Sequence, residues 1–191
     1  DIAVQAATEQ GANQSAVYDS VLHEKAIRRQ AIARYLQTAL EKNELEVRYR
    51  PTYNLKEKRF TRADSYMRIF IQGIGLVGAA EFIPIAEDSG QIRAVGYYAL
   101  EHAGQFIHEL IQAKKDFESI CIPVSPILLV QEDFLDQVNN ILDRYEIPEG
   151  KLALELDDEA LSSVYINVNV IMQELSSMGV ELVLNHFGSG C

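Results

Sequence analysis

The spacing of apolar residues changes near Asn43 and divides the chain into a helical part and a mixed part. Residues 21–43 place apolar side chains at helical intervals, which predicts a long helix capped by Ser20. After Asn43, alternating or short apolar runs predict five strands. These strands are 44–50, 60–71, 119–124, 151–156 and 180–184, the first of them ended by Pro51.

Helical patterns separate most of the predicted strands. They cover residues 79–90, 93–115, 132–145 and 158–179, and a further short helix is expected at 1–11. Strands that alternate with helices of this length pair in parallel through right-handed crossovers. The sequence therefore predicts an α/β fold.

Polar residues stand near the ends of the predicted strands. In α/β barrels and open sheets, functional residues gather where strands end and loops begin, so these side chains are expected to converge on one end of the sheet. The candidates are Arg50, Asp64, Arg68, Ser125, Glu155, Asn185 and His186.

The composition narrows the function classes. Hydrophobic residues make up 48% and charged residues 24% of the 191 residues, as in globular proteins. The net charge of −11 argues against nonspecific nucleic-acid binding, which needs clustered cations. No apolar run approaches the ~20 residues of a membrane span, and no signal peptide is evident. Cys121 and Cys191 lack metal spacing and form no visible disulfide framework, which favours a reducing cytoplasm.

Six segments in order resemble the EAL domain family, the barrel phosphodiesterases that linearise cyclic di-GMP. The resemblance runs through residues 36–190 and implies a TIM-like (β/α) barrel. About five strands are present, so the barrel is expected to be incomplete and to have an open edge along residues 180–184. The segments are LQTALEKNELEVRYRP, ADSYMRI, FIPIAEDSGQI, IPVS, LALELDDEAL and GVELVLNHFGSG.

The first residues are similar to the closing helix of a GGDEF, or diguanylate cyclase, domain. This resemblance implies a remnant of such a domain at 1–18, a linker and opening helix at 19–42, and the N-terminal part of an EAL domain at 43–191. Because the chain starts at Asp1 and not at a methionine, it is expected to be a piece cut from a longer protein. An adjoining GGDEF-like domain, another protein or a second copy of the chain is the expected partner.

The resemblance also assigns site residues, and several depart from the family pattern. The family uses two divalent cations, Mg²⁺ or Mn²⁺, and five of its metal-ligand positions can be matched to residues of this chain. Only Glu155 is unchanged, and Pro123 has no side-chain oxygen, so no metal cofactor is expected. The positions are Asp64, Pro123, Glu155, Asn185 and His186.

Two arginines are the expected ligand contacts, each with an alternative. Arg68 matches a phosphate-contacting position of the family, or it forms a salt bridge to Asp64 or Glu155. Arg50 replaces a glutamine and either binds phosphate or plugs the site. Glu155 itself is a remnant ligand or a carboxylate paired with a nearby cation. His186 either bonds its neighbours or joins a transition-metal site.

Three functions fit this pattern. The first is a catalytically degenerate EAL domain that acts as a regulatory or interaction module in cyclic di-GMP signalling. The second is a receptor that binds cyclic di-GMP, if only weakly, without hydrolysing it. The third, which Pro123, Asn185 and His186 disfavour, is an active phosphodiesterase.

Overall fold

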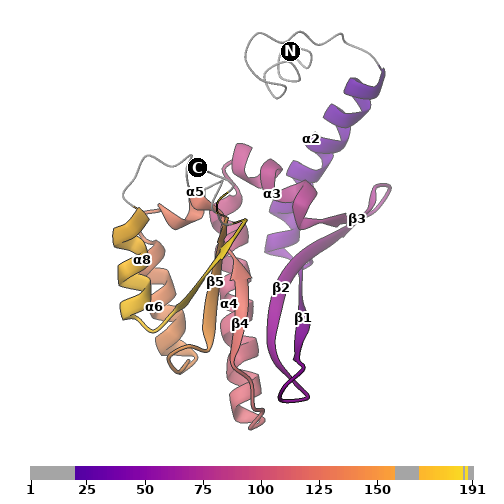
Figure 1. Cartoon of the computed structure of the whole chain (residues 1–191). Helices are drawn as coiled ribbons and strands as arrows, with labels where there is room; N and C mark the ends of the chain where they lie inside the picture. Colours follow the sequence, from indigo (N-terminus) through magenta and orange to yellow (C-terminus); the bar gives the residue numbers. More distant parts are fainter. Residues whose placement is uncertain (1–19, 158–167, 187, 189–191) are drawn as a thin grey trace.

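A six-stranded mixed sheet with helices against one face forms this protein, as the computed structural model shows (Figure 1). The structure describes residues 20–157, 168–186 and 188. The strands are β1 (Glu46–Asn54), β2 (Arg59–Ile71), β3 (Gly75–Gly78), β4 (Ser119–Pro123), β5 (Leu152–Asp157) and β6 (Glu181–Asn185). The helices are α2 (Ser20–Glu41), α3 (Ala79–Asp88), α4 (Ile92–Gln112), α5 (Pro126–Leu129), α6 (Phe134–Arg144) and α8 (Val168–Ser177).

Strand pairing agrees with the predicted α/β class but not with parallel pairing throughout. The sheet order is β1-β2-β4-β5-β6, with β3 also paired to β2. The pairs β2–β4, β4–β5 and β5–β6 are parallel, whereas β1 and β3 each run antiparallel to β2. The parallel prediction was wrong for the first strand because residues 55–58 form a hairpin turn, and so short a connection joins only antiparallel neighbours.

Two strand boundaries also differ from the prediction. β1 continues through Pro51 to Asn54, because it is the end strand of the sheet, where a residue without a backbone N–H is tolerated. The short strand β3 was not predicted. It begins at Gly75, and the φ angles of Gly73 and Gly75, 85° and 94°, allow the tight turn back along β2. The predicted helix at 1–11 and residues 158–167 of the last one lie outside the described residues.

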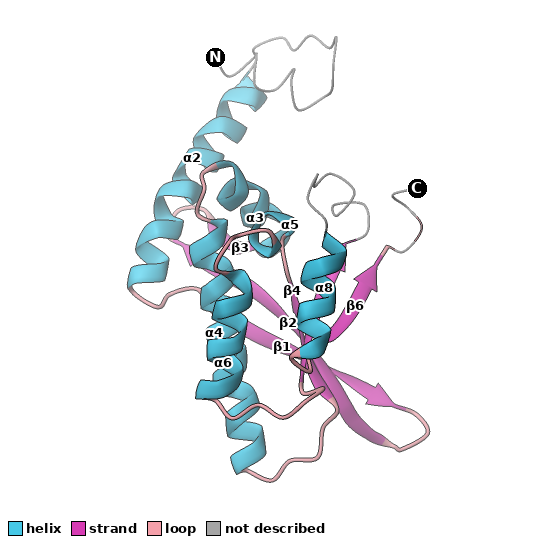
Figure 2. Cartoon of the chain, turned by 90° about the vertical axis from the view of Figure 1, so that its left-hand side faces the viewer, coloured by secondary structure: helices cyan, strands magenta, loops and turns pink. Residues whose placement is uncertain are grey.

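The core lies between the sheet and its helices. Along β2 every second side chain from Thr61 to Ile71 is buried, so one face of this strand packs inward. α4, α6 and α8 lie along that face of the sheet (Figure 2). α2 adds fully buried side chains from Ile32 and Leu36 and contacts α3. The opposite face of the sheet carries no helix among the described residues.

The sheet opens between β2 and β4. The two strands pair over only three residues each, Arg62–Asp64 with Ser119–Cys121. Beyond Asp64, β2 continues to Ile71 with β1 and β3 as its partners. The strands β1, β2 and β3 therefore form a ribbon that bends away from β4 (Figure 1).

Gly104 lies where α4 packs closely against the end of α6. A Cβ atom at this position would lie 2.7 Å from the Tyr145 ring and 2.8 Å from Ile141 Cγ2. We expect Gly104→Leu to lower the free energy of unfolding by about 2 kcal/mol, because overpacking forces the helices apart. Urea denaturation would measure this change.

Gly78→Ala provides the matched control, since nothing lies within 4 Å of a Cβ there. It should change the free energy of unfolding by less than about 0.5 kcal/mol. Equal unfolding midpoints for Gly104→Leu and the unsubstituted protein would contradict the close packing of α4 on α6.

Candidate functional site

Six of the predicted site residues lie on the helix-free face of the sheet, whereas Ser125 and His186 follow the ends of β4 and β6. Side chains alternate between the two faces along a strand, and the buried residues next to the predicted ones point toward the helices. Residues paired in neighbouring strands point to the same face, so the register identifies this face in every strand from β1 to β6. The predicted residues on this face are Arg50, Asp64, Arg68, Pro123, Glu155 and Asn185.

The register separates these residues into two groups. Arg50 pairs with Asp64 on the ribbon, and Asp64 pairs with Cys121 of β4. Glu155 stands one pleat further along, opposite Pro123. Because β2 and β4 part after this point, the ribbon group and the β5–β6 group do not form one continuous cluster. Among the described residues, no hydrogen bond or ion pair joins Arg50, Asp64 or Arg68 to Glu155.

On the ribbon, the arginines are engaged by local partners. Arg68 Nε donates to Glu46 Oε2 at 2.8 Å, and Arg48 Nη2 lies 2.9 Å from the same oxygen. The hydrogen bond from Arg68, and then that from Arg48, holds the pKa of Glu46 below its usual range. The predicted alternative partners Asp64 and Glu155 were wrong, because Glu46 is the cross-strand neighbour of Arg68. Arg50 lies with its guanidinium carbon 5.7 Å from the centre of the Tyr66 ring.

At the ends of β5 and β6, protein donors occupy the carboxylates. Asn185 Nδ2 donates to Glu155 Oε1 at 2.9 Å. His186 Nδ1 lies 2.7 Å from Asp157 Oδ2, and its backbone N–H donates to Asn185 Oδ1. Sequence reasoning missed Asp157, although the period of two along β5 places it on the same face as Glu155. His186 has a φ of 51°, so the chain turns sharply as β6 ends.

This arrangement does not fit two divalent cations. Mg²⁺ and Mn²⁺ prefer oxygen ligands, and a pair of them needs several carboxylates. Pro123 offers no side-chain donor, and the Asn185 amide turns its N–H toward Glu155. Within the described ranges, no group of three or more His, Cys, Asp or Glu side chains is placed to hold a metal.

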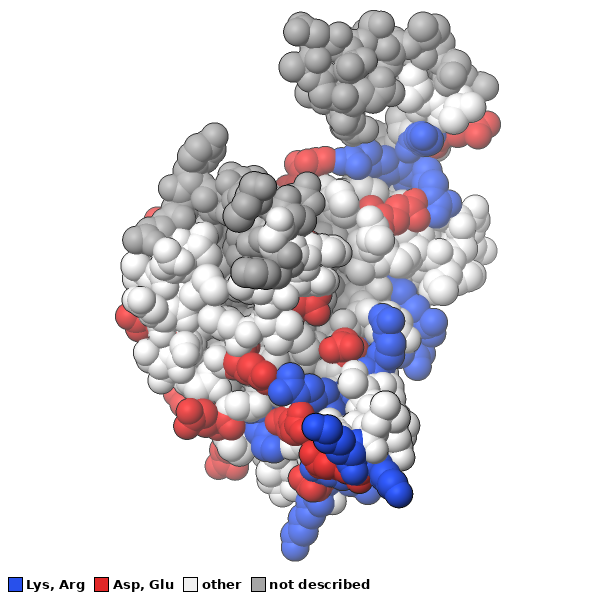
Figure 3. All heavy atoms as spheres, in the orientation of Figure 1, with Lys and Arg blue, Asp and Glu red and all other residues white. Residues whose placement is uncertain are grey.

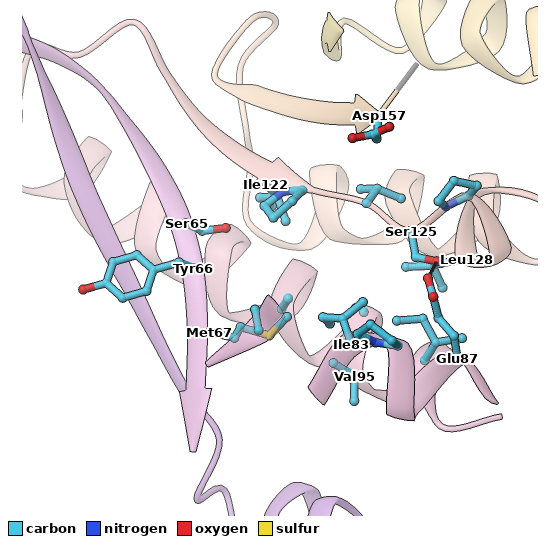
Figure 4. A pocket seen from close by; sticks show the side chains of 18 of the residues that line it. Ser65, Tyr66, Met67, Ile83, Glu87, Val95, Ile122, Ser125, Leu128 and Asp157 are labelled. Carbon is cyan, nitrogen blue, oxygen red and sulfur yellow. Dashed lines mark hydrogen bonds between the residues drawn. The ribbon is translucent and has the colours of Figure 1, made fainter. Parts of the chain in front are cut away.

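A cavity of about 410 Å³ opens where β2 and β4 separate (Figure 4). Apolar side chains from β2, α3, α4 and β4 form most of its lining, including Met67, Ile83, Val95 and Ile122. Ser125 Oγ donates to Glu87 Oε1 at 2.6 Å across one side of it. The sequence predicted Ser125 as a polar residue at a strand end, but it gave no sign of the cavity.

The family model for the EAL domain matches residues 33–191. The chain belongs to the EAL domain family. One relative is the bifunctional diguanylate cyclase/cyclic di-GMP phosphodiesterase MucR of Pseudomonas aeruginosa, which is 25% identical over 100% of this chain and 28% of its own length. Another is the probable cyclic di-GMP phosphodiesterase PdeI of Escherichia coli, 27% identical over 83% of this chain and 21% of its own length. The chain thus spans about a quarter of the length of these relatives.

Solved structures agree with the family. The PaMucR phosphodiesterase in complex with c-di-GMP superposes with a TM-score of 0.77 at 25% identity, covering 84% of this chain and 65% of that one. The FimX EAL domain from P. aeruginosa bound to c-di-GMP gives a TM-score of 0.72 at 18% identity over 83% of this chain and 63% of its own, a likeness of fold. EAL domains are TIM-like barrels, and the mixed sheet described above is consistent with part of one. No described helix is long and apolar enough to cross a membrane.

Cys121 lies on the same face as Asp64 and Glu155 but is buried. Burial, followed by the nearby charges of Glu155, Asp64 and Glu181, raises the pKa of its thiol to about 12. We expect Cys121 in a Cys191→Ser variant to react with iodoacetamide at about pH 8 on the order of 10³-fold more slowly than a free thiol, because only the thiolate attacks.

The rate should rise as the pH approaches 12 and should reach that of a free thiol in urea at any pH. Mass spectrometry of the alkylated protein would follow the reaction. Rapid alkylation of the folded protein at neutral pH would contradict the burial and the acidic surroundings of this thiol.

Proposed function

We propose that this chain is a non-hydrolysing EAL domain that serves as a regulatory or interaction module in cyclic di-GMP signalling. The observation that carries the proposal is the hydrogen bond from Asn185 Nδ2 to Glu155 Oε1. It fills a family metal position with an amide donor and engages the one unchanged carboxylate. The imidazole of His186 likewise fills a family metal position, and it pairs with the carboxylate of Asp157.

The first test of this proposal is hydrolysis. We expect the protein to form no linear dinucleotide from cyclic di-GMP above a no-enzyme control, with Mg²⁺ or with Mn²⁺, because four of the five family ligand positions are changed. Chromatography of the products would measure this. Metal-dependent turnover that Glu155→Ala abolishes would show an active phosphodiesterase and refute the proposal.

The matched gain-of-function variant combines Asp64→Glu, Pro123→Asn, Asn185→Asp and His186→Asp. We expect it to bind Mn²⁺ at least about tenfold more tightly than the unsubstituted protein, because together the changes restore the oxygen ligands and the carboxylate charge of the family pattern. Isothermal titration calorimetry would compare the two. Equal Mn²⁺ affinity would show that these four positions are not what separates this chain from a metal-binding site.

A second candidate function, a receptor for cyclic di-GMP, is favoured by the cavity between β2 and β4. Its volume of about 410 Å³ falls in the usual range for small-molecule sites, and its apolar lining suits the face of a nucleobase. Arg68 and Arg50 do not line the cavity but lie on the helix-free face of the ribbon that forms one wall, where they would contact phosphates that extend beyond it. Both MucR and FimX were solved with this ligand.

Glu46 competes with phosphate for Arg68 in this receptor. We expect weak or no binding of cyclic di-GMP by the unsubstituted protein and about fivefold tighter binding after Glu46→Gln, because the freed guanidinium can pair with phosphate. Arg68→Ala should remove the remaining affinity, and calorimetry would measure all three proteins. Tight binding that survives Arg68→Ala would contradict this location of the ligand.

We further propose that the module belongs to a larger cytoplasmic protein. The bifunctional relative MucR supports an arrangement in which a GGDEF-like domain precedes residues 19–42 and the EAL domain follows at 43–191. α2 would then act as the linker, since Arg28 forms two hydrogen bonds to Glu81 of α3 at 2.5 and 2.9 Å. A homodimer or another protein is the expected partner of the open sheet.

A further inference from the structure

The end of the molecule opposite Glu155 and Asn185 has a surface that combines exposed apolar side chains with lysines. It comprises the β1–β2 turn and the loop between α4 and β4, which touch where Glu118 N–H donates to Thr61 O at 2.6 Å. This pair of loops lies at the lower end of the molecule in Figures 1 and 3. We call it the basal surface and define it by Tyr53, Leu55, Lys56, Lys58, Phe60, Lys114 and Lys115.

Apolar side chains of the basal surface are exposed to solvent. Leu55 is 82% exposed at the turn, Phe60 is 59% exposed and Tyr53 is 46% exposed. The rings of Tyr53 and Phe60 meet edge to face with centroids 5.2 Å apart. A hollow of about 300 Å³ lies beside Phe60 and is lined further by Phe106, Leu110 and Phe117. Exposed apolar side chains grouped at one end of a protein are typical of an interaction surface.

The surrounding charge is positive although the protein is acidic. Residues 53–62 and 113–118 contain six Lys or Arg and three Asp or Glu, a net charge of +3 in a chain of −11. The three carboxylates are engaged, since Glu57 and Asp116 pair with Arg59 and Glu118 pairs with Arg62. No ion pair within the described residues involves Lys56, Lys58, Lys114 or Lys115. Blue atoms accordingly gather at this end in Figure 3.

Backbone preference does not account for two of these lysines. Lys58 and Lys114 have φ angles of 56° and 51°, in the left-handed region that glycine and asparagine favour. Lys58 closes the β1–β2 turn, and Lys114 follows α4 where a helix commonly ends on glycine. A residue of greater conformational freedom would fit both turns better.

We propose that the basal surface docks on an anionic lipid bilayer. Leu55, Tyr53 and Phe60 would enter the interfacial region, while the lysines contact the phosphate groups. Charge complementarity favours a bilayer, because four unpaired lysines border the apolar side chains and the rest of the protein repels an anionic surface. Docking in this orientation leaves Glu155 and the cavity directed away from the lipid.

Vesicle sedimentation would test this proposal with the 191-residue chain. Vesicles of phosphatidylcholine alone are compared with vesicles containing about one-third phosphatidylglycerol. We expect the partition coefficient to be at least about tenfold higher on the anionic vesicles in about 0.1 M salt and to fall in about 0.5 M salt. Partition that is equal on the two, or absent from both, would overturn the proposal and leave a protein as the partner of this surface.

Two variants and two controls locate the contact. Lys56→Gln with Lys58→Gln should lower partition about 25-fold, at about fivefold for each lysine, and Leu55→Ser should lower it at least about tenfold. The control Lys25→Gln with Lys42→Gln removes the same charge from α2 and the turn that follows it, and Leu76→Ser removes an exposed leucine from β3. Circular dichroism would check that all variants fold. If the controls lower partition as much as the basal variants do, the proposal is refuted.

Discussion

β2 is the element on which the rest of the structure depends, because over 13 residues one of its faces is buried and the other is not. One face buries every second side chain against the helices, and the other carries Asp64, Tyr66 and Arg68. Its edges also change partner. β1 pairs with it from Arg59 to Arg68, whereas β4 pairs only with Arg62–Asp64 and β3 with Arg68–Ile71. The opening of the sheet, the cavity and the division of the site all follow from this change.

Local pairing then determines what the charged residues can do. Arg68 is bound to its cross-strand neighbour Glu46, and Asn185 is bound to Glu155 on the adjacent strand. Each contact satisfies a group that would otherwise be available to a phosphate or a cation. Within this EAL domain, these polar side chains therefore bind one another.

The two ends of the sheet carry different kinds of side chain. The carboxyl ends of β5 and β6 carry Glu155, Asp157 and Asn185, whereas the opposite end carries exposed apolar side chains and lysines. Among the described helices, α2 connects to α3 through Arg28 and Glu81, and α3 supplies Glu87 to the cavity.

The sequence by itself determined the α/β class and the chemistry of each candidate residue. Both depend on local information, since alternation identifies a strand and Pro123 lacks a side-chain oxygen in any fold. Only the tertiary structure decided that β1 runs antiparallel to β2, that Arg68 pairs with Glu46 rather than Asp64, and that Asn185 reaches Glu155. Direction and partner are set by strand register, which joins residues 22 to 30 positions apart and leaves no periodic trace in the chain.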